Sequence, residues 1–321
     1  SQDIALPYVG KLVRIDFGIR DLNLRQLKTN FPLGIISEDL CTIPWPKISR
    51  IAMKYQRGRV LVIAGSAMYR GAAFLTLKGA LASGAGCIYA VLPSDVAENL
   101  WQVTPEVILK GVLEQESSEK ESFRDSLKKF DLENIDVVLI GPGLGKSSPA
   151  FDDSCNELQE FKGLLVLDAE GINQLSLHKE GWKWLKQRKG PTWLTPHLVE
   201  FSRLFPELRG IPPLDAAKVA SEITGSGILL KGANTVISEP GGIQILSTDP
   251  EAPHLATAGS GDILCGIISA LISQGMDCFK AASAASWLHA HAASSFGPGL
   301  ISEDLLKQLP KTIAEVIYET R

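Results

Sequence analysis

The stretch Arg59–Ala72, RVLVIAGSAMYRGA, contains the pattern that decides the fold. It begins with a nearly continuous apolar run, Arg59–Ala64, that is rich in β-branched residues. Runs of this kind mark strands covered on both faces, as strands of parallel sheets are. The glycine-containing loop Gly65–Ala72 follows and leads into a helical pattern, Ala72–Ser83. A strand, a glycine loop and a helix in this order predict one βα unit.

The same pattern recurs along the chain and predicts an α/β fold. Alternation of strands and helices over this length indicates right-handed βαβ units in a doubly wound, mostly parallel sheet with helices on both faces. A turn of sequence Glu-Pro-Gly predicts a small β-hairpin at one edge, formed by Thr235–Ser238 and Gly242–Ser247. The other predicted strands are Cys87–Leu92, Asp136–Ile140, Leu164–Leu167, Trp193–Thr195 and Ile228–Lys231. The other predicted helices are Glu119–Lys129, Asp152–Phe161, Leu198–Leu204, Asp215–Thr224, Gly261–Gln274, Cys278–Phe296 and Ser302–Ile317.

The N-terminal part of the chain lacks this alternation. Lys11–Ile19 alternates like a strand, and a polar stretch then leads to Thr42–Pro46, where two prolines oppose regular structure. We interpret residues 21–57 as an extended linker with a short helical turn after Ser37. The predicted organisation is an N-terminal segment and linker over 1–57, followed by one domain over 58–321.

The composition is that of a globular protein and excludes several functional classes. Of 321 residues, 45% are hydrophobic and 21% charged, which excludes a disordered chain. The net charge of -4 argues against a dedicated nucleic-acid or membrane-surface protein. No apolar run approaches the roughly 18 residues of a membrane span, and Ser1–Gly10 has neither the basic start nor the apolar core of a signal peptide. The 5 cysteines form no CxxC pair and no metal-ligand spacing, so we expect reduced thiols and a cytoplasmic location.

Small and polar residues follow five of the predicted strands directly. In open α/β sheets, ligands bind beyond the carboxyl ends of the strands. One such loop can be a mere turn, but five at one predicted edge indicate a ligand site. Neither glycine loop has the GxGxxG or GxxxxGKS pattern, which excludes a dinucleotide fingerprint and a Walker phosphate loop. The loops are Gly65–Ala72 (GSAMYRGA), Gly141–Gly145 (GPGLG), Asp168–Asn173 (DAEGIN), Thr195–Glu200 (TPHLVE) and Lys231–Thr235 (KGANT).

The sharpest chemical signal is Ala256–Gly266, ATAGSGDILCG. Glycines let the backbone approach a phosphate closely, and free amides at a helix start bind anions with help from the helix dipole. We therefore predict an anion hole formed by Gly259, Ser260 and Gly261. Asp262 beside it can take the proton from a hydroxyl that attacks phosphorus. Since the ordinary pKa of Asp is about 3.9, we expect Asp262 to be ionised without a large shift. The alternative is that Asp262 only complements the helix dipole.

These motifs, in this order, resemble those of the ADP/ATP-dependent NAD(P)H-hydrate dehydratases, enzymes of the ribokinase-like superfamily. Such enzymes repair NADH and NADPH that have been inactivated by hydration. The resemblance extends from about Gly58 to His291. It implies one ribokinase-like domain, ATP or ADP as co-substrate, Mg²⁺ bridging the nucleotide phosphates, and a homo-oligomer, with a tetramer favoured.

The resemblance also implies roles for individual residues. Asp262 would be the catalytic base, and Glu200 would order Mg²⁺ through water, with no direct protein ligand to the metal. The nucleotide would be bound by Lys231, Gly232, Ala233, Asn234, Thr235 and Gly261. The NAD(P)H hydrate would be bound by Ala72, Gly143, Gly145, His197 and Asp262. Without the resemblance, Lys231 could be a solvated lysine at a strand end, His197 a structural histidine and Glu200 a surface glutamate.

The chain departs from the family pattern at two places. The family usually has Asp-Ala-Asp-Ala where this chain has Asp168-Ala-Glu170-Gly171, and it often has Gly where this chain has Val199. Neither change removes a catalytic group, so both bear on the detail of the substrate site. The implied activity is dehydration of the (S)-hydrate of NADH or NADPH, through phosphorylation of the C6 hydroxyl and elimination of phosphate. The alternatives are a ribokinase-like small-molecule kinase and a catalytically silent nucleotide-binding protein.

The N-terminal stretch Gly10–Ile19, GKLVRIDFGI, has a resemblance of its own. It is similar to the closing strand of the NAD(P)H-hydrate epimerase domain, which precedes the dehydratase in many bacteria. This similarity suggests that the chain is the C-terminal part of a bifunctional repair enzyme, and it predicts no epimerase activity for the chain itself. An unrelated N-terminal strand is the alternative.

Overall fold

The computed structural model describes residues 33–34, 40, 43–46, 48–49, 51–113, 132–146, 150–241, 243–248 and 252–319. The predicted strand Lys11–Ile19, the predicted helix Glu119–Lys129 and most of the predicted turn after Ser37 lie outside these residues.

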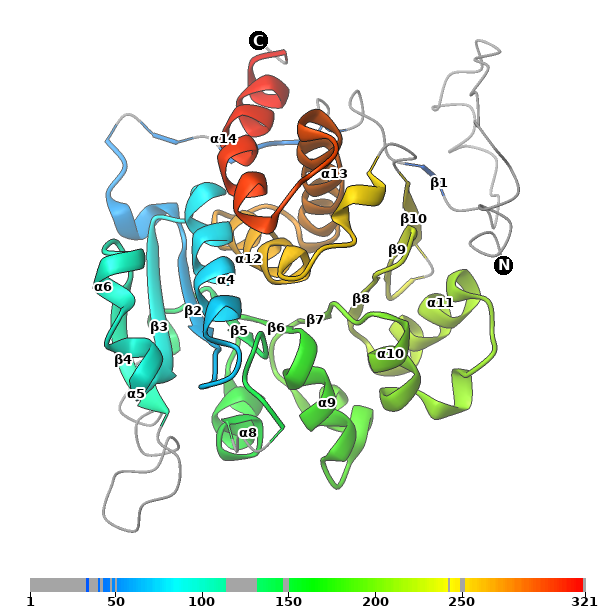
Figure 1. Cartoon of the computed structure of the whole chain (residues 1–321). Coiled ribbons are helices and arrows are strands. Elements are labelled where there is room, and N and C mark those ends of the chain that lie inside the picture. The colour runs from blue at the N-terminus through cyan, green and yellow to red at the C-terminus, as the bar shows by residue number, and fades with distance from the viewer. Residues whose placement is uncertain are drawn as a thin grey trace, which may run out of the picture.

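One ten-stranded sheet runs through the described part of the chain, in the order β1-β10-β9-β8-β7-β6-β5-β2-β3-β4 (Figure 1). Of these strands only β9 is antiparallel to its neighbours, which confirms a mostly parallel sheet. The hairpin β9–β10 forms as predicted, but β1 pairs beyond β10, so the hairpin is not the outer edge. The strands are β1 (Leu33–Gly34), β2 (Arg59–Ile63), β3 (Cys87–Pro93), β4 (Ile108–Leu113), β5 (Val137–Ile140), β6 (Leu164–Leu167), β7 (Thr192–Leu194), β8 (Gly227–Leu230), β9 (Asn234–Glu239) and β10 (Ile243–Thr248).

The central strands are buried on both faces, as their apolar sequences predict. Every residue of β5, β6, β7 and β8 is buried. Successive side chains of β2 enter different cores, because side chains alternate along a strand. Val60 and Val62 belong to one apolar cluster, whereas Leu61 and Ile63 belong to the other.

Helices cover both faces of the sheet and contribute to these two clusters (Figure 1). One layer consists of α4 (Arg70–Ala82), α12 (Ser260–Ser273), α13 (Cys278–Phe296) and α14 (Ser302–Glu319). The other consists of α8 (Ala150–Glu160), α9 (Ala169–Leu177), α10 (Leu198–Leu204) and α11 (Pro213–Thr224). Within the described ranges, no helix has the length and apolarity needed to cross a membrane. The doubly wound α/β fold is therefore confirmed.

The elements that the sequence does not predict include β4 and α9, besides β1 and the short helices α5 (Ser94–Ala97) and α6 (Leu100–Val103). The strand β4 lies at an edge of the sheet and has half-exposed side chains, with Lys110 and Gly111 at its centre, so it lacks the apolar run of a buried strand. The helix α9 lies in a stretch that we interpreted as a loop. It contains Gly171, at which a Cβ atom would lie 2.6 Å from the carbonyl oxygen of Ile140. Close packing against β5, not flexibility, requires that glycine.

Part of the N-terminal segment packs on the domain. Leu40 is completely buried in one apolar cluster, and Ile43 and Trp45 pack against that cluster. Lys54–Arg57 forms a short 3₁₀ helix, and β1 adds a strand to the sheet. The part of the predicted linker that holds Leu40, Ile43 and Trp45 therefore packs on the domain, whereas Ile48, Ile51, Met53 and Tyr55 are exposed. The domain boundary at residue 58 remains a prediction.

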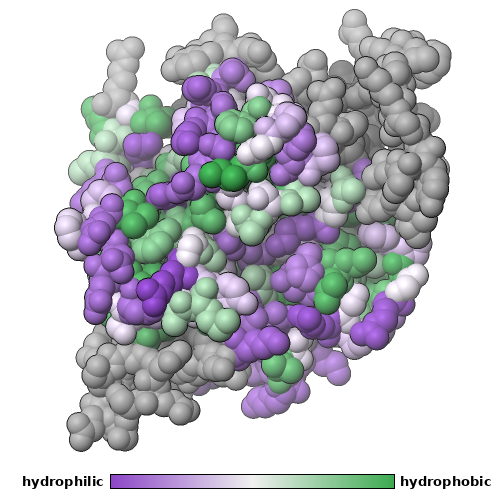
Figure 2. Space-filling view, in the orientation of Figure 1, coloured by the Kyte–Doolittle hydropathy of each residue, from purple (hydrophilic) through white to green (hydrophobic). Residues whose placement is uncertain are grey.

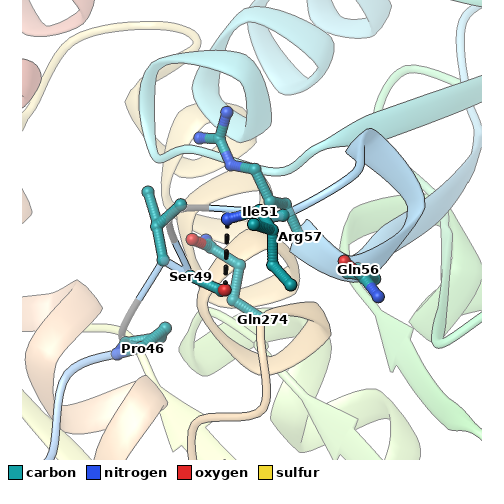
Figure 3. A pocket seen from close by; sticks show the side chains of 8 residues that line it. Pro46, Ser49, Ile51, Gln56, Arg57 and Gln274 are labelled. Carbon is teal, nitrogen blue, oxygen red and sulfur yellow. Dashed lines mark hydrogen bonds between the residues drawn. The ribbon is translucent and has the colours of Figure 1, made fainter.

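A cavity of about 310 Å³ lies at the C-terminal end of α12 (Figure 3). Asp262 lies in the first turn of the same helix. The 14 residues of α12 separate the two places by roughly 20 Å at 1.5 Å per residue, so this cavity is distinct from the predicted site. The cavity is lined by Pro46, Ile48, Ser49, Ile51, Ala52, Gln56, Arg57 and Gln274.

Candidate active site

The parallel strands bring the predicted loops together at the carboxyl ends of the strands. A Cβ atom at Gly141 would overlap the carbonyl oxygen of Asp168, so the loops after β5 and β6 are in contact. At Gly143, a Cβ atom would lie 2.7 Å from the Cβ of Ala72, which joins the loop after β2. Two predicted hydrate-binding residues, Ala72 and Gly143, are therefore neighbours. Figure 2 shows a recessed hydrophilic area between the two helix layers, with apolar patches on either side.

The N-terminus of α12 has the backbone geometry of an anion site. Gly259 precedes the helix with a φ of 87°, a left-handed conformation that favours glycine. A helix start leaves its first amides without carbonyl partners. None of the backbone hydrogen bonds among the described residues uses the amides of Gly261 and Asp262, whereas the Ser260 amide makes a long 3.4 Å bond to Thr257. Of the predicted anion hole, Gly261 therefore offers a free donor and Ser260 does not, and the neighbouring Asp262 adds a free amide.

Asp262 lies in an environment that opposes its ionisation. Burial raises the pKa of its carboxyl to about 7, the negative charges of Asp168 and Glu200 act in the same direction, and Lys231 opposes them. The expectation of an ordinary pKa is therefore wrong, because it took no account of burial and of two further carboxylates. A residue that only complemented the helix dipole would have a lowered pKa. A base with a pKa near 7 is suited to proton transfer at neutral pH.

Lys231 reaches from the end of β8 into the same cluster. Its Nζ lies 2.7 Å from Oδ1 of Asp168, and a Cβ atom at Gly261 would lie 3.4 Å from this Nζ. The ammonium group is thus next to the anion hole. Burial alone would lower the pKa of Lys231, but the carboxylates of Asp168 and Glu200 outweigh burial and raise it. Lys231 is therefore not a solvated lysine at a strand end.

His197 and Glu200 form the start of α10 together. Nδ1 of His197 accepts hydrogen bonds from the amides of Val199 and Glu200, and Oε2 of Glu200 accepts one from the His197 amide at 2.8 Å. Only 7% of the Glu200 side chain is exposed, and burial together with Asp168 raises its pKa. The interpretation of Glu200 as a surface glutamate is therefore wrong. His197 caps the helix, and with 50% of its side chain exposed its ring can also contact a ligand.

The remaining predicted site residues are open to solvent. Gly232 and Ala233 are exposed, and Asn234, Thr235 and Gly145 are partly exposed. The described residues contain no group of three side chains able to hold a metal ion. The backbones of His197, at the start of α10, and Lys231, directly after β8, form a parallel bridge.

Two residues of this region were not predicted from the sequence. Asp168 was noted only as a member of its loop, although a carboxylate directly after a buried strand is itself a signal. His289 on α13 is 6% exposed, and its Nε2 has no hydrogen-bond partner among the described residues. Burial lowers the pKa of His289 to about 4, although a hydrogen bond with the backbone of Ser260 opposes the change. The alanine-rich sequence around His289 gives no sign that it contacts the anion hole.

Comparison with known proteins shows the family to which the chain is similar. The family model described as NAD(P)H-hydrate dehydratase matches residues 60–315. A bifunctional NAD(P)H-hydrate repair enzyme of Gloeobacter violaceus is 36% identical over 91% of this chain and 56% of its own length. The enzyme of the same description from Synechocystis is 35% identical, over 91% of this chain and 55% of its own length. The chain thus spans about half the length of these curated relatives.

Solved structures show the same fold. A structure of the ADP/ATP-dependent NAD(P)H-hydrate dehydratase of Bacillus subtilis, co-crystallised with ATP and Mg²⁺, has a TM-score of 0.72 at 25% identity, over 89% of this chain and 99% of its own. A ribokinase-like superfamily protein of Enterococcus faecalis has a TM-score of 0.73 at 23% identity, over 88% of this chain and 96% of its own. The ribokinase-like character of the fold is therefore confirmed.

Proposed function

The chain belongs to the NAD(P)H-hydrate dehydratase family, and on that basis we propose that it removes water from the (S)-hydrate of NADH or NADPH with ATP or ADP as phosphoryl donor. One observation supports the assignment of this activity to particular residues. The buried carboxyl of Asp262, whose pKa is raised to about 7, lies in the same helical turn as the free amide of Gly261. A proton acceptor next to an anion site is what phosphoryl transfer to a hydroxyl requires.

The chemistry explains why a nucleotide is used. Hydroxide is a poor leaving group, whereas phosphate is a good one. Asp262 takes the proton of the C6 hydroxyl as its oxygen forms a bond to the terminal phosphorus of the nucleotide and the bond to the remaining nucleotide breaks. The lone pair of the ring nitrogen then expels phosphate from C6. Loss of a proton from C5 restores the ring double bond, so the products are NAD(P)H, phosphate and ADP or AMP.

The anion hole and Lys231 act on the charge of the transferred group. The free amides of Gly261 and Asp262 and the ammonium of Lys231 lie close together at the start of α12. Donors fixed in this way stabilise negative charge as it develops, without reorganisation. The rest of the Lys231–Thr235 loop is open to solvent and would bind the remainder of the nucleotide. Ala72, Gly143, Gly145 and His197 would hold the hydrate on the other side.

Mg²⁺ suits the carboxylate oxygens of this site, which are the ligands that it prefers. When bound to the nucleotide, it would neutralise phosphate charge. Glu200 is the residue that would hold one of its waters, because its buried carboxylate faces the cluster of Asp168 and Lys231. We further propose that the protein is cytoplasmic and a homo-oligomer, with a tetramer favoured. Light scattering on the purified chain would test the oligomeric state.

The experiment that tests the proposed function follows the dihydronicotinamide absorbance. The purified chain is mixed with NADH hydrate and Mg²⁺, with and without ATP or ADP. We expect absorbance to recover only with nucleotide, and one phosphate to be released for each ring restored. A stable phosphorylated product without recovery of absorbance would favour a small-molecule kinase. Binding of ATP with no turnover of any kind would favour a silent nucleotide-binding protein.

A further inference from the structure

Asp168 occupies a helix-capping position but does not cap the helix. It is the N-cap residue of α9, where an aspartate normally accepts hydrogen bonds from the first free amides. Its side chain makes no such bond. Instead, Oδ1 accepts a 2.7 Å bond from Nζ of Lys231 and a 2.8 Å bond from Oγ1 of Thr195. The carboxylate is directed away from its own helix and toward the end of β8.

The backbone next to Asp168 is strained. Ala169 has a φ of 45°, and it is the one non-glycine residue with positive φ in the described part of the chain. Such a conformation costs roughly 1–3 kcal/mol and persists only where surrounding structure imposes it. Ala169 is the first residue of α9, so the strain lies directly after the residue that binds Lys231.

The ammonium group of Lys231, which Asp168 binds, has further hydrogen-bond donors. An ammonium group has three N–H donors, and among the described residues the Lys231 Nζ donates one hydrogen bond, to Asp168. The exposed fraction of the Lys231 side chain is 22%, against 2% for Asp168. Its Nζ lies near Gly261, whose amide is free.

We infer that Asp168 is a positioning residue that holds the Lys231 ammonium at the anion hole, where its remaining donors meet the transferred phosphoryl group. A lysine side chain without a partner has many rotamers, and fixing it costs entropy at each turnover. Asp168, braced by Thr195, keeps the ammonium in place before the nucleotide binds. This inference rests on the proposed function for its catalytic consequence, but its geometry concerns nucleotide binding alone.

The test is a double-mutant cycle between Asp168→Asn and Lys231→Met. In the wild-type background, Lys231→Met should lower kcat by about 100-fold and weaken ATP affinity by about tenfold. In the Asp168→Asn background, the same change should cost less than about threefold in each, because the ammonium is no longer held at the site. Equal effects of Lys231→Met in both backgrounds would overturn the inference.

Two further variants separate positioning from stability. Asp136→Asn is the matched control, because Asp136 also pairs with a cation, Arg59. Asp136 precedes β5 and so lies at the amino ends of the strands, opposite the site. This change should leave kcat and ATP affinity unchanged. If Asp168→Asn does not fold, Asp168→Glu keeps the charge and displaces it by one methylene. The cycle with Asp168→Glu should show the same loss of the Lys231 effect, and an undiminished effect would overturn the inference.

A pH profile gives a readout that a merely structural ion pair would not move. The charged groups that act on Asp262 are Asp168, Glu200 and Lys231, and Asp262 in turn raises the pKa of the Cys265 thiol on its own helix. Lys231→Met should move the acid limb of kcat/KM to higher pH, because a positive charge near Asp262 is lost. The same change should move the limb less in the Asp168→Asn background, where the ammonium is no longer held at the site. An equal movement in both backgrounds would overturn the inference. ATP affinity, measured by calorimetry without hydrate, tests the coupling even if the chain proves not to dehydrate.

Discussion

At the residue scale, the protonation of Asp262 links the packing of the site to its rate. The pKa of about 7 means that a large part of the population holds a protonated, inactive Asp262 in mildly acidic solution. We predict that kcat/KM falls about tenfold for each pH unit below 7, because the base must be ionised. A pH profile of NADH-hydrate dehydration between pH 5 and 9 checks this. A rate that stayed constant down to about pH 5 would show that Asp262 keeps the ordinary pKa of an aspartate.

His289 predicts a second pH effect, on stability rather than on rate. Its pKa is about 4 in the folded protein and 6.5 in the reference state, so the unfolded chain binds more protons between these values. Stability should therefore be complete above pH 6.5 and decrease as pH falls toward 4, by on the order of 3 kcal/mol from this residue. Urea unfolding of His289→Gln should give a flatter dependence on pH than the wild type. Parallel curves would show that His289 is accessible to protons when folded.

At the element scale, the contact between α4 and α12 depends on two glycines that face each other's helix. A Cβ atom at Gly266 would overlap the carbonyl oxygen of Thr76, and one at Gly79 would lie 2.8 Å from the carbonyl oxygen of Ile263. We predict that Gly266→Ala destabilises the protein by about 1–3 kcal/mol, because the helices must separate.

Gly71 provides the control for this change. It also lies in α4, but a Cβ atom there would have no neighbour within 4 Å. Gly71→Ala should be neutral or stabilise the protein by up to about 1 kcal/mol. Urea unfolding of both variants measures their free energies of unfolding. Equal stability of the two variants would contradict close packing at Gly266. Because α12 carries Asp262, Gly266→Ala should also reduce activity.

Elements were predictable from the sequence where burial dominates their composition. The strand Leu164–Leu167 and the helices Leu198–Leu204 and Cys278–Phe296 were predicted with the bounds that the structure shows. The edge strand β4 was missed, because an edge strand needs no continuous apolar run. α9 was missed because the glycine within it suggested a loop. In both cases the contact that stabilises the element is with a strand elsewhere in the sequence, β3 for β4 and β5 for α9.

The site was predictable to the level of its loops but not of its interactions. Glycines and a following aspartate identify an anion site locally, since they lie within a few residues of one another. The ion pair of Asp168 with Lys231 joins residues 63 positions apart, and the raised pKa of Asp262 depends on three elements meeting at one edge. No local pattern contains that information.

At the scale of the whole molecule, the N-terminal segment should affect stability more than chemistry. None of the predicted site residues precedes Gly58. A chain that begins at Ala52 lacks the buried Leu40 and the strand β1. We predict that it retains dehydration per folded molecule but loses about 2–5 kcal/mol of stability, the usual cost of removing a buried leucine. Thermal unfolding and initial rates below the transition check this, and a folded but inactive truncation would place part of the site before residue 52.

The central claim is that Asp262 is the base of a nucleotide-dependent dehydration, and Asp262→Asn tests it most directly. Asparagine keeps the size of the side chain and removes the proton acceptor. The measurement is the recovery of dihydronicotinamide absorbance from NADH hydrate with ATP and Mg²⁺ by wild type and variant, with ATP affinity and thermal stability recorded on the same preparations. We predict a fall in turnover of roughly 10² to 10⁴, with ATP binding retained. The variant should also unfold at a higher temperature than the wild type at pH 8, because a buried charge is gone. This difference in unfolding temperature should decrease toward pH 5, where the wild-type carboxyl is protonated as well. Turnover close to that of the wild type in a folded variant would contradict the claim.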